Sequence, residues 1–262
     1  MRRLLVGLCA LSLLLGGCSS DGSTDGESQA DEATELTVFA ASSLTAAFND
    51  RIGPGFEAAN DGTIVVFNFG ASDSLAGQIQ SEGSADVFAS ASSTWMDAVQ
   101  DDPGVSDRTD FVQNRLVIIM PPDNPAGIAS IEDLAIQGVQ LVLAAEGVPV
   151  GDYSREVLDN AGILADAEGN VVSNEEDNAS VVTKIAGGEA DAGIVYESDI
   201  SSAAGNDVGS VAIPDDVNVI ATYPMAVVVG APDAKLAAEF VKYVTGDEGQ
   251  AILTEYGFEP IT

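Results

Sequence analysis

Short hydrophobic runs alternate with amphipathic stretches from Glu35 to the end of the chain. Short apolar runs are typical of buried strands, and apolar residues three and four positions apart are typical of helices that cover them. The alternation therefore predicts an α/β fold in which strands and helices follow one another. The expected strands are 36–40, 63–68, 86–90, 116–120, 139–145, 171–173, 192–196 and 217–229, the last broken at Pro224.

Helices are expected between these strands. The first follows Ser43 and is disturbed at Gly53-Pro54-Gly55, because glycine and proline both interrupt helices. Trp95 and Met96 are expected in the core of an early helix, and 224–229 is expected to be a crossing strand and not a ligand surface. The other expected helices lie near 75–79, 151–161, 181–185, 233–245 and 248–256.

The alternation restarts after Pro121-Pro122, which predicts two small α/β lobes. We expect one lobe to contain 35–120 and, on the return of the chain, 224–262, while 121–223 forms the other. The chain would cross between them near Met120 and near Tyr223. Because both crossings are extended segments, the lobes would form a hinged pair.

The N-terminus has the pattern of an export signal. A basic start, Met1-Arg2-Arg3, precedes an apolar run over 4–15 that is shorter than the about 20 residues a membrane-spanning helix needs. The following Leu15-Gly16-Gly17-Cys18 resembles a bacterial lipobox, in which 1–17 is removed and Cys18 becomes the acylated first residue. A plain signal peptide with an incidental cysteine is the alternative. With Cys9 removed and Cys18 acylated, neither a disulfide nor a thiolate nucleophile would remain.

The next segment, 18–34, contains no large apolar side chain and predicts a flexible acidic tether. Within it, the spacing of five residues matches that of a calcium-binding loop. The flanking helices are missing from the sequence, so an acidic linker that matches by chance is the preferred interpretation. These residues are Asp21, Ser23, Asp25, Gly26 and Glu32.

Composition excludes several classes of function. The 262 residues include 9 Lys and Arg against 42 Asp and Glu, which gives a formal net charge of −33. So few basic side chains disfavour binding to nucleic acid or to an anionic membrane surface. The chain has no histidine, so a Ser-His-Asp triad, a Cys-His pair and an HExxH zinc site are all excluded. A hydrophobic content of 46% indicates a folded body.

Small polar residues stand between a strand and a helix at four places: Ala41-Ser42-Ser43, Gly70-Ala71-Ser72, Val150-Gly151 and Asp177-Asn178. Helix N-termini present unpaired N–H groups and a partial positive charge, which suits oxyanions. In open α/β sheets such ends converge on one crevice. Any one of these sites taken singly is better explained as an ordinary helix cap. Together they predict a cage of neutral donors between the lobes.

Eight motifs resemble the molybdate-binding proteins of bacterial ABC importers, and they occur in family order from about Leu36 to Phe258. Each motif is weak alone, and the set is specific. The motifs are Thr37-Val-Phe-Ala-Ala-Ser-Ser43-Leu-Thr, Phe69-Gly-Ala-Ser72, Ala85-Asp-Val-Phe-Ala-Ser-Ala, Trp95-Met, Val148-Pro-Val-Gly151-Asp-Tyr, Glu176-Asp-Asn178, Gly193-Ile-Val-Tyr196-Glu-Ser-Asp and Tyr223-Pro.

The resemblance implies a two-lobed periplasmic-binding-protein-like fold of type II, with two mixed sheets flanked by helices and joined by two hinge crossings. It also implies a monomeric binding protein without enzymatic activity or cofactor, anchored through Cys18 and facing the periplasm or cell exterior. The protein would deliver molybdate or tungstate, held as an oxyanion without direct metal coordination, to a permease and its ATPase. The implied ligands are hydroxyls and N–H groups of Ser43 and Ser72, N–H groups of Val150 and Asn178, and the phenol of Tyr196.

Asp73 departs from the family, which has a small uncharged residue after Ser72. A carboxylate in the first turn of a helix and pointing to solvent is the simpler explanation, as it is for Glu175, Glu176 and Asp177. A second explanation is an acceptor for a protonated oxyanion such as phosphate. A receptor for sulfate, phosphate or another small anion stays an alternative in the same class. A serine or carboxylate hydrolase and a calcium-dependent adhesin are alternatives from other classes, the former opposed by the missing G-x-S-x-G motif.

Overall fold

The computed structural model describes residues 33–83, 85–201 and 207–261. The predicted leader, Cys18, the tether up to residue 32 and the calcium-like spacing lie outside the described residues. From Ala33 onward the chain forms one compact unit. Its strands are β1 (Thr34–Ala41), β2 (Thr63–Gly70), β3 (Val87–Ala89), β4 (Val105–Met120), β5 (Leu141–Ala144), β6 (Val171–Glu175), β7 (Ala192–Tyr196), β8 (Gly209–Ala212) and β9 (Ile220–Val228).

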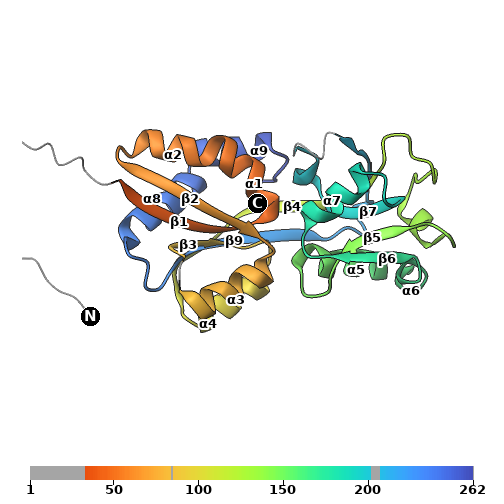
Figure 1. Ribbon diagram of the computed structural model, residues 1–262, viewed down its shortest axis with the longest axis horizontal. Coiled ribbons are helices and arrows are strands. Elements are labelled where there is room, and N and C mark those ends of the chain that lie inside the picture. The colour runs from red at the N-terminus through yellow and green to blue at the C-terminus, as the bar shows by residue number, and fades with distance from the viewer. Residues whose placement is uncertain (1–32, 84, 202–206, 262) are drawn as a thin grey trace, which may run out of the picture. The chain divides into compact units, whose positions relative to one another are not determined.

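The helices connect these strands, as the alternation predicts (Figure 1). The α-helices are α1 (Thr45–Ala47), α2 (Gly53–Ala59), α3 (Ser72–Glu82), α4 (Ser93–Asp101), α5 (Pro149–Asn160), α6 (Leu164–Glu168), α7 (Asn178–Ala186), α8 (Ala234–Thr245) and α9 (Asp247–Glu255). Shorter 3-10 or π turns are η1 (Ser42–Leu44), η2 (Phe48–Ile52), η3 (Ile131–Ala135) and η4 (Glu197–Ser201).

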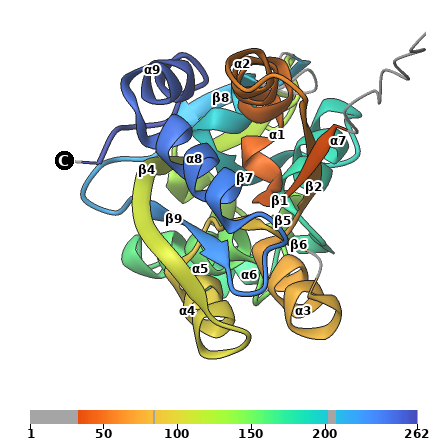
Figure 2. The same cartoon turned by 90° about the vertical axis from the view of Figure 1, so that its left-hand side faces the viewer.

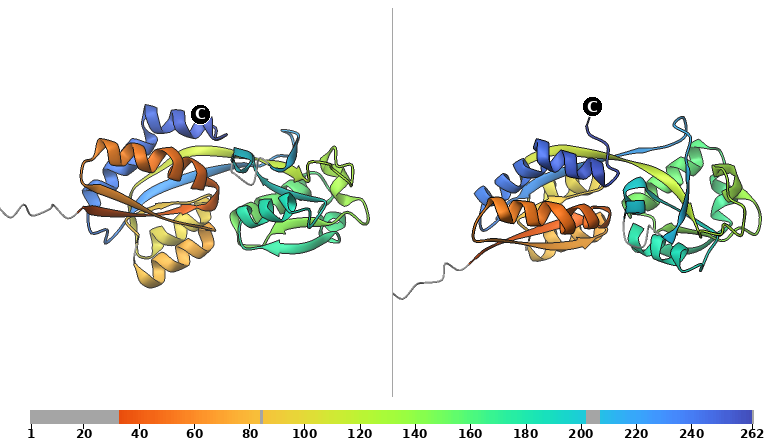
Figure 3. Two further views of the ribbon diagram at one scale, coloured as in Figure 1. Left: turned by 45° about the horizontal axis from the view of Figure 1, so that its top comes forward. Right: turned by 90° about the horizontal axis from the view of Figure 1, so that it is seen from above.

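The strands form a mixed sheet in the order β2-β1-β3-β9-β4-β7-β5-β6, with β8 also paired to β4. Strand β1 runs parallel to β2 and β3, and β5 runs parallel to β6 and β7. The long strand β4 joins the two groups, because it pairs with β9 as far as Arg115 and with β7 from Leu116. The two mixed sheets expected from the resemblance are therefore continuous through β4 (Figure 3).

Helices cover both faces of the first group of strands. Figure 2 shows α2, α8 and α9 on one side of β1 and β9, and α3 and α4 on the other. Beneath the first set of helices, Phe48, Phe56 and Phe240 are almost fully buried. Their rings meet edge to face, with centroids 5.1 Å apart for Phe56 and Phe240 and 6.1 Å apart for Phe48 and Phe240. This aromatic cluster fixes the helical run after β1 on the sheet.

Among the differences from the expected elements, three have a local physical reason. Strand β4 begins at Val105 and not at 116, because residues 105–110 are exposed or half-buried and mostly polar and so lack an apolar run. Pro224 does not break β9: it lies opposite Asp110, at a register shift in β4 where a missing N–H is tolerated. The first helix continues through 53–55 after a π turn.

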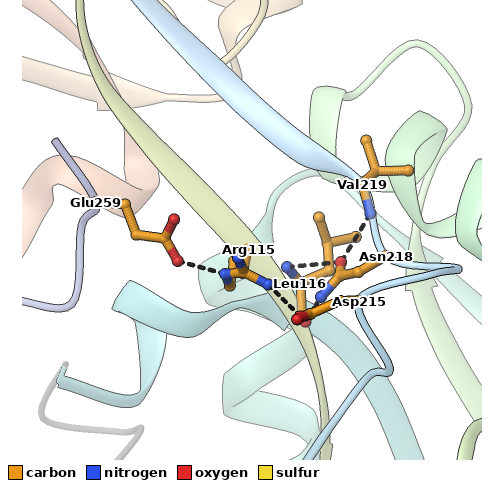
Figure 4. Close-up of polar contacts among 6 residues, drawn as sticks. All are labelled: Arg115, Leu116, Asp215, Asn218, Val219 and Glu259. Atoms are coloured by element: carbon orange, nitrogen blue, oxygen red, sulfur yellow. Dashed lines mark hydrogen bonds and ion pairs between the residues drawn. The ribbon is translucent and has the colours of Figure 1, made fainter. Parts of the chain in front are cut away.

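A polar cluster marks the point where β4 changes partners (Figure 4). Asn218 accepts the Leu116 N–H (3.3 Å) and donates to the Leu116 carbonyl (2.9 Å). The side-chain amide of Asn218 thus takes the place of a neighbouring strand for the Leu116 backbone. Arg115 contacts Glu259 and Asp215, the latter at 2.5 Å. These contacts tie β4 to the segment before β9 and to the C-terminal segment.

Candidate functional site

Three α-helices begin at one small cavity of ≈ 10 Å³. Helix α3 begins at Ser72, α5 at Pro149 and α7 at Asn178, so Val150 also lies in a first turn. First-turn N–H groups have no partner within their helix and carry the positive end of its dipole. The cavity is lined by Ala41, Ser42, Gly70, Ala71, Ser72, Ala91, Val148, Pro149, Val150, Asn178 and Tyr196.

The sequence explains why the helices begin there. Pro149 occupies an N-terminal position of α5, where its missing N–H costs nothing. Asp177 caps α7 by accepting the Ser180 N–H at 2.8 Å. The acid expected to be an ordinary cap is therefore one, and the neighbouring Asn178 is left on the cavity wall.

Gly151 allows α5 to approach the end of β5. A Cβ atom at Gly151 would lie 2.1 Å from the carbonyl oxygen of Ala145 and 2.6 Å from that of Ala144. Real Cβ atoms do not approach backbone so closely, so only glycine fits between the helix and the strand end. The first turn of α5, with Val150, reaches the cavity because of this close packing.

Tyr196 brings a buried phenol to the same cavity. The side chain is 1% exposed, and its hydroxyl has no hydrogen-bond partner among the described residues. Burial and the neighbouring Tyr223 raise the pKa of the Tyr196 phenol well above its ordinary value, so the phenol keeps its proton. A buried, unpartnered O–H is costly, and a ligand that accepts from it would remove that cost.

The two predicted serines differ in their surroundings. Ser72 Oγ accepts the Ala91 N–H at 3.0 Å, which leaves its own proton available to a ligand. Ser43 Oγ lies 2.9 Å from the Tyr223 hydroxyl, and Asn114 Nδ2 donates to that hydroxyl at 3.4 Å. Since an amide nitrogen only donates, the Tyr223 hydroxyl accepts from Asn114 and can donate its own hydrogen bond to Ser43 Oγ, which leaves the Ser43 O–H available to a ligand.

Ser43 lies beside a larger cavity of ≈ 340 Å³ and not among the residues that line the small one. Ser42 lines both cavities and so stands between them. The residues of the larger cavity are Ser42, Ser43, Thr45, Ala46, Asn49, Asp50, Ala179, Val182, Thr183, Ser198 and Asp199.

A chain of hydrogen bonds separates the two cavities. The Ser42 hydroxyl donates to Asn178 Oδ1, and Asn178 Nδ2 donates to Asp199 Oδ1 at 2.6 Å. The second carboxylate oxygen of Asp199 accepts the Tyr196 N–H at 3.0 Å. Burial raises the pKa of the Asp199 carboxyl to about 7, although the hydrogen bonds that it accepts from Tyr196 and Asn178 lower it.

Two side chains differ from the sequence interpretation. Met96 is buried in the core as expected, whereas Trp95 packs against that core from α4 but is only half-buried, and it donates its indole N–H to the Gly147 carbonyl at 2.9 Å. This bond links α4 to the loop that leads into α5. Asp73 is half-buried rather than fully turned to solvent, and its Oδ1 is buried without a partner among the described residues.

The site offers donors and partial positive charge, and neither cavity has a lysine or arginine among its described lining residues. In the described part of the chain, no group of three or more His, Cys, Asp or Glu residues is placed to hold a metal ion. No helix among those same residues has the length and apolar character to cross a membrane. The arrangement suits a small, fully deprotonated anion held by neutral donors.

Ser72, Val150, Asn178 and Tyr196 therefore lie together, and Ser43 lies next to them; their part in binding stays a prediction. Sequence reasoning did not select Ser42, Asn114, Asp199 or Tyr223 as site residues. Three of these four stand inside motifs that carry the family resemblance, which was the available signal. Asn114 gives no such signal, because it lies outside those motifs and before the predicted strand 116–120.

Residues 36–259 match the family described as bacterial extracellular solute-binding proteins. The molybdate-binding protein ModA of Mycobacterium tuberculosis is 37% identical over 256 residues, which cover 97% of this chain and 94% of that protein. The periplasmic molybdate-binding protein of Azotobacter vinelandii has the same fold, with a TM-score of 0.76 and 21% identity over 87% of this chain and 100% of the other. The sulfate-binding protein SubI of M. tuberculosis gives a TM-score of 0.76 and 17% identity over 87% of each chain.

Proposed function

Because this chain belongs to the bacterial extracellular solute-binding proteins, and to the molybdate-binding proteins among them, we propose that it binds molybdate outside the cytoplasm for an ABC importer. It is a binding protein and not an enzyme, and its family binds molybdate as a ligand without any cofactor. We extend the proposal to tungstate, because an ion of nearly the same radius and charge satisfies the same donors.

The observation that carries the proposal is the buried Tyr196 hydroxyl, which has no partner among the described residues and lies on a cavity where three helices begin. In the proposed complex, Tyr196 donates its O–H, Ser43 and Ser72 donate hydroxyl and N–H groups, and Val150 and Asn178 donate N–H groups. Neutral donors can replace the water around a dianion without a buried cation. This matters in a chain of formal charge −33, where ionised side chains repel the ligand.

The fold alone does not choose the anion, because molybdate- and sulfate-binding proteins share it with equal TM-scores. Molybdate is preferred here for the 37% identity to a molybdate-binding protein. Sulfate and phosphate are the alternatives, and cage radius would decide between them. An ion that is too small leaves donors unpaired at about 1–3 kcal/mol each.

The cavity walls support the proposed hinge between the lobes. One wall comes from η1 and α3, and the other from α5 and α7. A volume of ≈ 10 Å³ suits one water molecule, so a larger oxyanion enters only if the walls separate. The crossings proposed near Met120 and Tyr223 lie in β4 and β9, and β4 changes strand partners at Arg115 and Leu116. Bending at these strands would open the cavity.

Export and anchoring complete the proposal. The leader 1–17 would direct secretion, and acylated Cys18 with the tether to residue 34 would hold the protein at the membrane. The protein would act as a monomer and pass its anion to a permease coupled to an ATPase. Mass spectrometry of the membrane fraction tests the anchor, since a diacylglycerol adduct on Cys18 is expected and an unmodified or soluble product would contradict it.

Isothermal titration of the purified protein with molybdate, tungstate, sulfate and phosphate at one salt concentration tests the function. We expect one-to-one binding of molybdate and tungstate at least about 100-fold tighter than that of the other two, since a wrong radius unpairs at least two donors. If sulfate or phosphate bound most tightly, the assignment of the fold would stand and the proposed ligand would change. Heat signals from none of the four would contradict the proposal.

Asp73→Ser tests whether the unusual carboxylate sets the choice of anion. We expect unchanged affinity for molybdate, because Asp73 is not among the residues that line the small cavity. Stability should change by less than about 1 kcal/mol, since the variant loses a first-turn carboxylate but also a buried oxygen without a partner. Titration with phosphate is the decisive measurement: a loss of phosphate binding only in the variant would assign Asp73 to a protonated oxyanion.

A further inference from the structure

Asp199 is a buried carboxylate placed directly behind the proposed donors. It is 5% exposed, and no lysine or arginine pairs with it in the described part of the chain. The charged and titratable groups around it are acids and phenols, none of which compensates a negative charge. They are Asp50 beside the larger cavity, Asp177 before α7, Glu197 on its own turn, Tyr196 on β7 and Tyr223 on β9.

The direction of the hydrogen bonds is fixed while Asp199 is ionised. A carboxylate only accepts, so Asn178 must turn its Nδ2 toward Asp199 and its Oδ1 toward Ser42. The Ser42 hydroxyl then has to donate to Asn178. In this state the Ser42 O–H is used in the hydrogen bond to Asn178 and is not available to an anion, although Ser42 lines the anion cavity.

Protonation allows the whole chain of bonds to reverse. A proton from solvent on Asp199 Oδ1 makes that oxygen a donor, and the Asn178 amide can turn over to present Oδ1 to it. Asn178 Nδ2 then donates to Ser42 Oγ, and the Ser42 proton points away from Asn178. No bond is lost in the exchange, and one hydroxyl is released toward the cavity.

We infer that Asp199, Asn178 and Ser42 form a proton-coupled relay that gives the bound oxyanion one more donor, the Ser42 hydroxyl. This inference rests on the proposed function. Binding of a dianion next to Asp199 favours the neutral carboxyl through like-charge repulsion, so one proton is taken up as the anion binds. Asp199 is a positioning residue in this scheme, because it acts on the anion only through Asn178 and Ser42.

The predicted pH dependence has a definite sign. Because the neutral carboxyl is the form that favours the anion, affinity for molybdate rises as the pH falls through the titration of Asp199. Burial brings the pKa of Asp199 to about 7, so the effect falls in an accessible range. For one coupled proton, the Kd rises with pH by at most about tenfold for each unit above that pKa.

Titration calorimetry with molybdate from about pH 6 to about pH 9 brackets that pKa and tests the relay. Asp199→Asn carries a fixed donor in place of the carboxyl proton, so it should bind at high pH as tightly as the unaltered protein does at low pH. Ser42→Ala should lose the gain in affinity at low pH and keep the affinity at high pH. Asp86→Asn is the matched control, because Asp86 is also buried but lines neither cavity, and its pH profile should not change.

A second measurement needs no variant and covers the case in which Asp199→Asn fails to fold. Binding enthalpies in two buffers of different ionisation enthalpy give the number of protons taken up, expected to be at most about 0.5 at about pH 7 and to approach 1 at about pH 8. A flat pH profile without proton uptake overturns the relay and leaves the binding protein intact. A protein that binds neither molybdate nor tungstate overturns the relay and the proposed function together.

Discussion

Gly151→Ala is expected to abolish tight anion binding and to destabilise the protein. The new methyl group would lie 2.1 Å from the Ala145 carbonyl oxygen, so α5 must move away from the end of β5. That movement withdraws the Val150 N–H from the cavity. We expect affinity for molybdate to fall by up to about 100-fold, as for the loss of one donor, and the free energy of unfolding to fall by about 3 kcal/mol.

Gly77→Ala is the matched control for this prediction. Gly77 lies on an exposed face of α3, and a Cβ atom there would meet no heavy atom within 4 Å. The variant should gain about 1 kcal/mol of stability and keep its affinity, because alanine favours helix without disturbing the N-terminus at Ser72. Titration calorimetry and denaturant unfolding of both variants give the comparison. Wild-type affinity in Gly151→Ala would show that the position of α5 is not part of the site.

Tyr196→Phe is expected to weaken binding and, unusually, to stabilise the anion-free protein. The hydroxyl is buried without a partner among the described residues, so its removal relieves an unmet hydrogen bond worth about 1–3 kcal/mol. The same removal deprives the anion of one donor, and affinity for molybdate should fall by about 10- to 100-fold. Thermal unfolding with and without molybdate measures both effects on one sample.

Tyr243→Phe separates the two effects. The Tyr243 hydroxyl is likewise buried without a partner among the described residues, but it lies beside Gly55 and lines neither of the two cavities at the site. We expect a similar gain in stability and no change in affinity. If Tyr196→Phe bound molybdate as tightly as the unaltered protein, the phenol would not be a ligand and the proposed cage would lose its central donor.

Local patterns determined most of the secondary structure. Strand β7 occupies the predicted 192–196, and helices α5 and α8 begin and end within two residues of the predicted positions. These elements carry apolar residues at the spacing of their own periodicity, and Gly, Pro, Asp or Asn stands at or directly beside at least one end of each. The first half of β4 lacks that pattern, because the strand is stabilised by its pairing with β9 and leaves polar side chains exposed.

The sequence by itself also determined the kind of chemistry at the site. The lack of histidine excluded common catalytic machinery, and strand ends followed by Ser72, Val150 and Asn178 indicated donors for an anion. Tyr196 came only from the resemblance to a family, since nothing in its spacing selects a phenol. The junction Ala41-Ser42-Ser43 was also among the predicted donor sites, but only the resemblance distinguished Ser43 from Ser42.

Only the tertiary structure decided how these donors are supported. Ser42 meets Asn178 across 136 residues of chain, and Ser43 meets Tyr223 across 180. The close fit of Gly151 against Ala145 and the bond from Trp95 to Gly147 are likewise contacts between elements. Periodicity and spacing report which face of an element is buried, because they reflect local geometry. They do not report which polar group a buried side chain meets, because that depends on how distant segments pack.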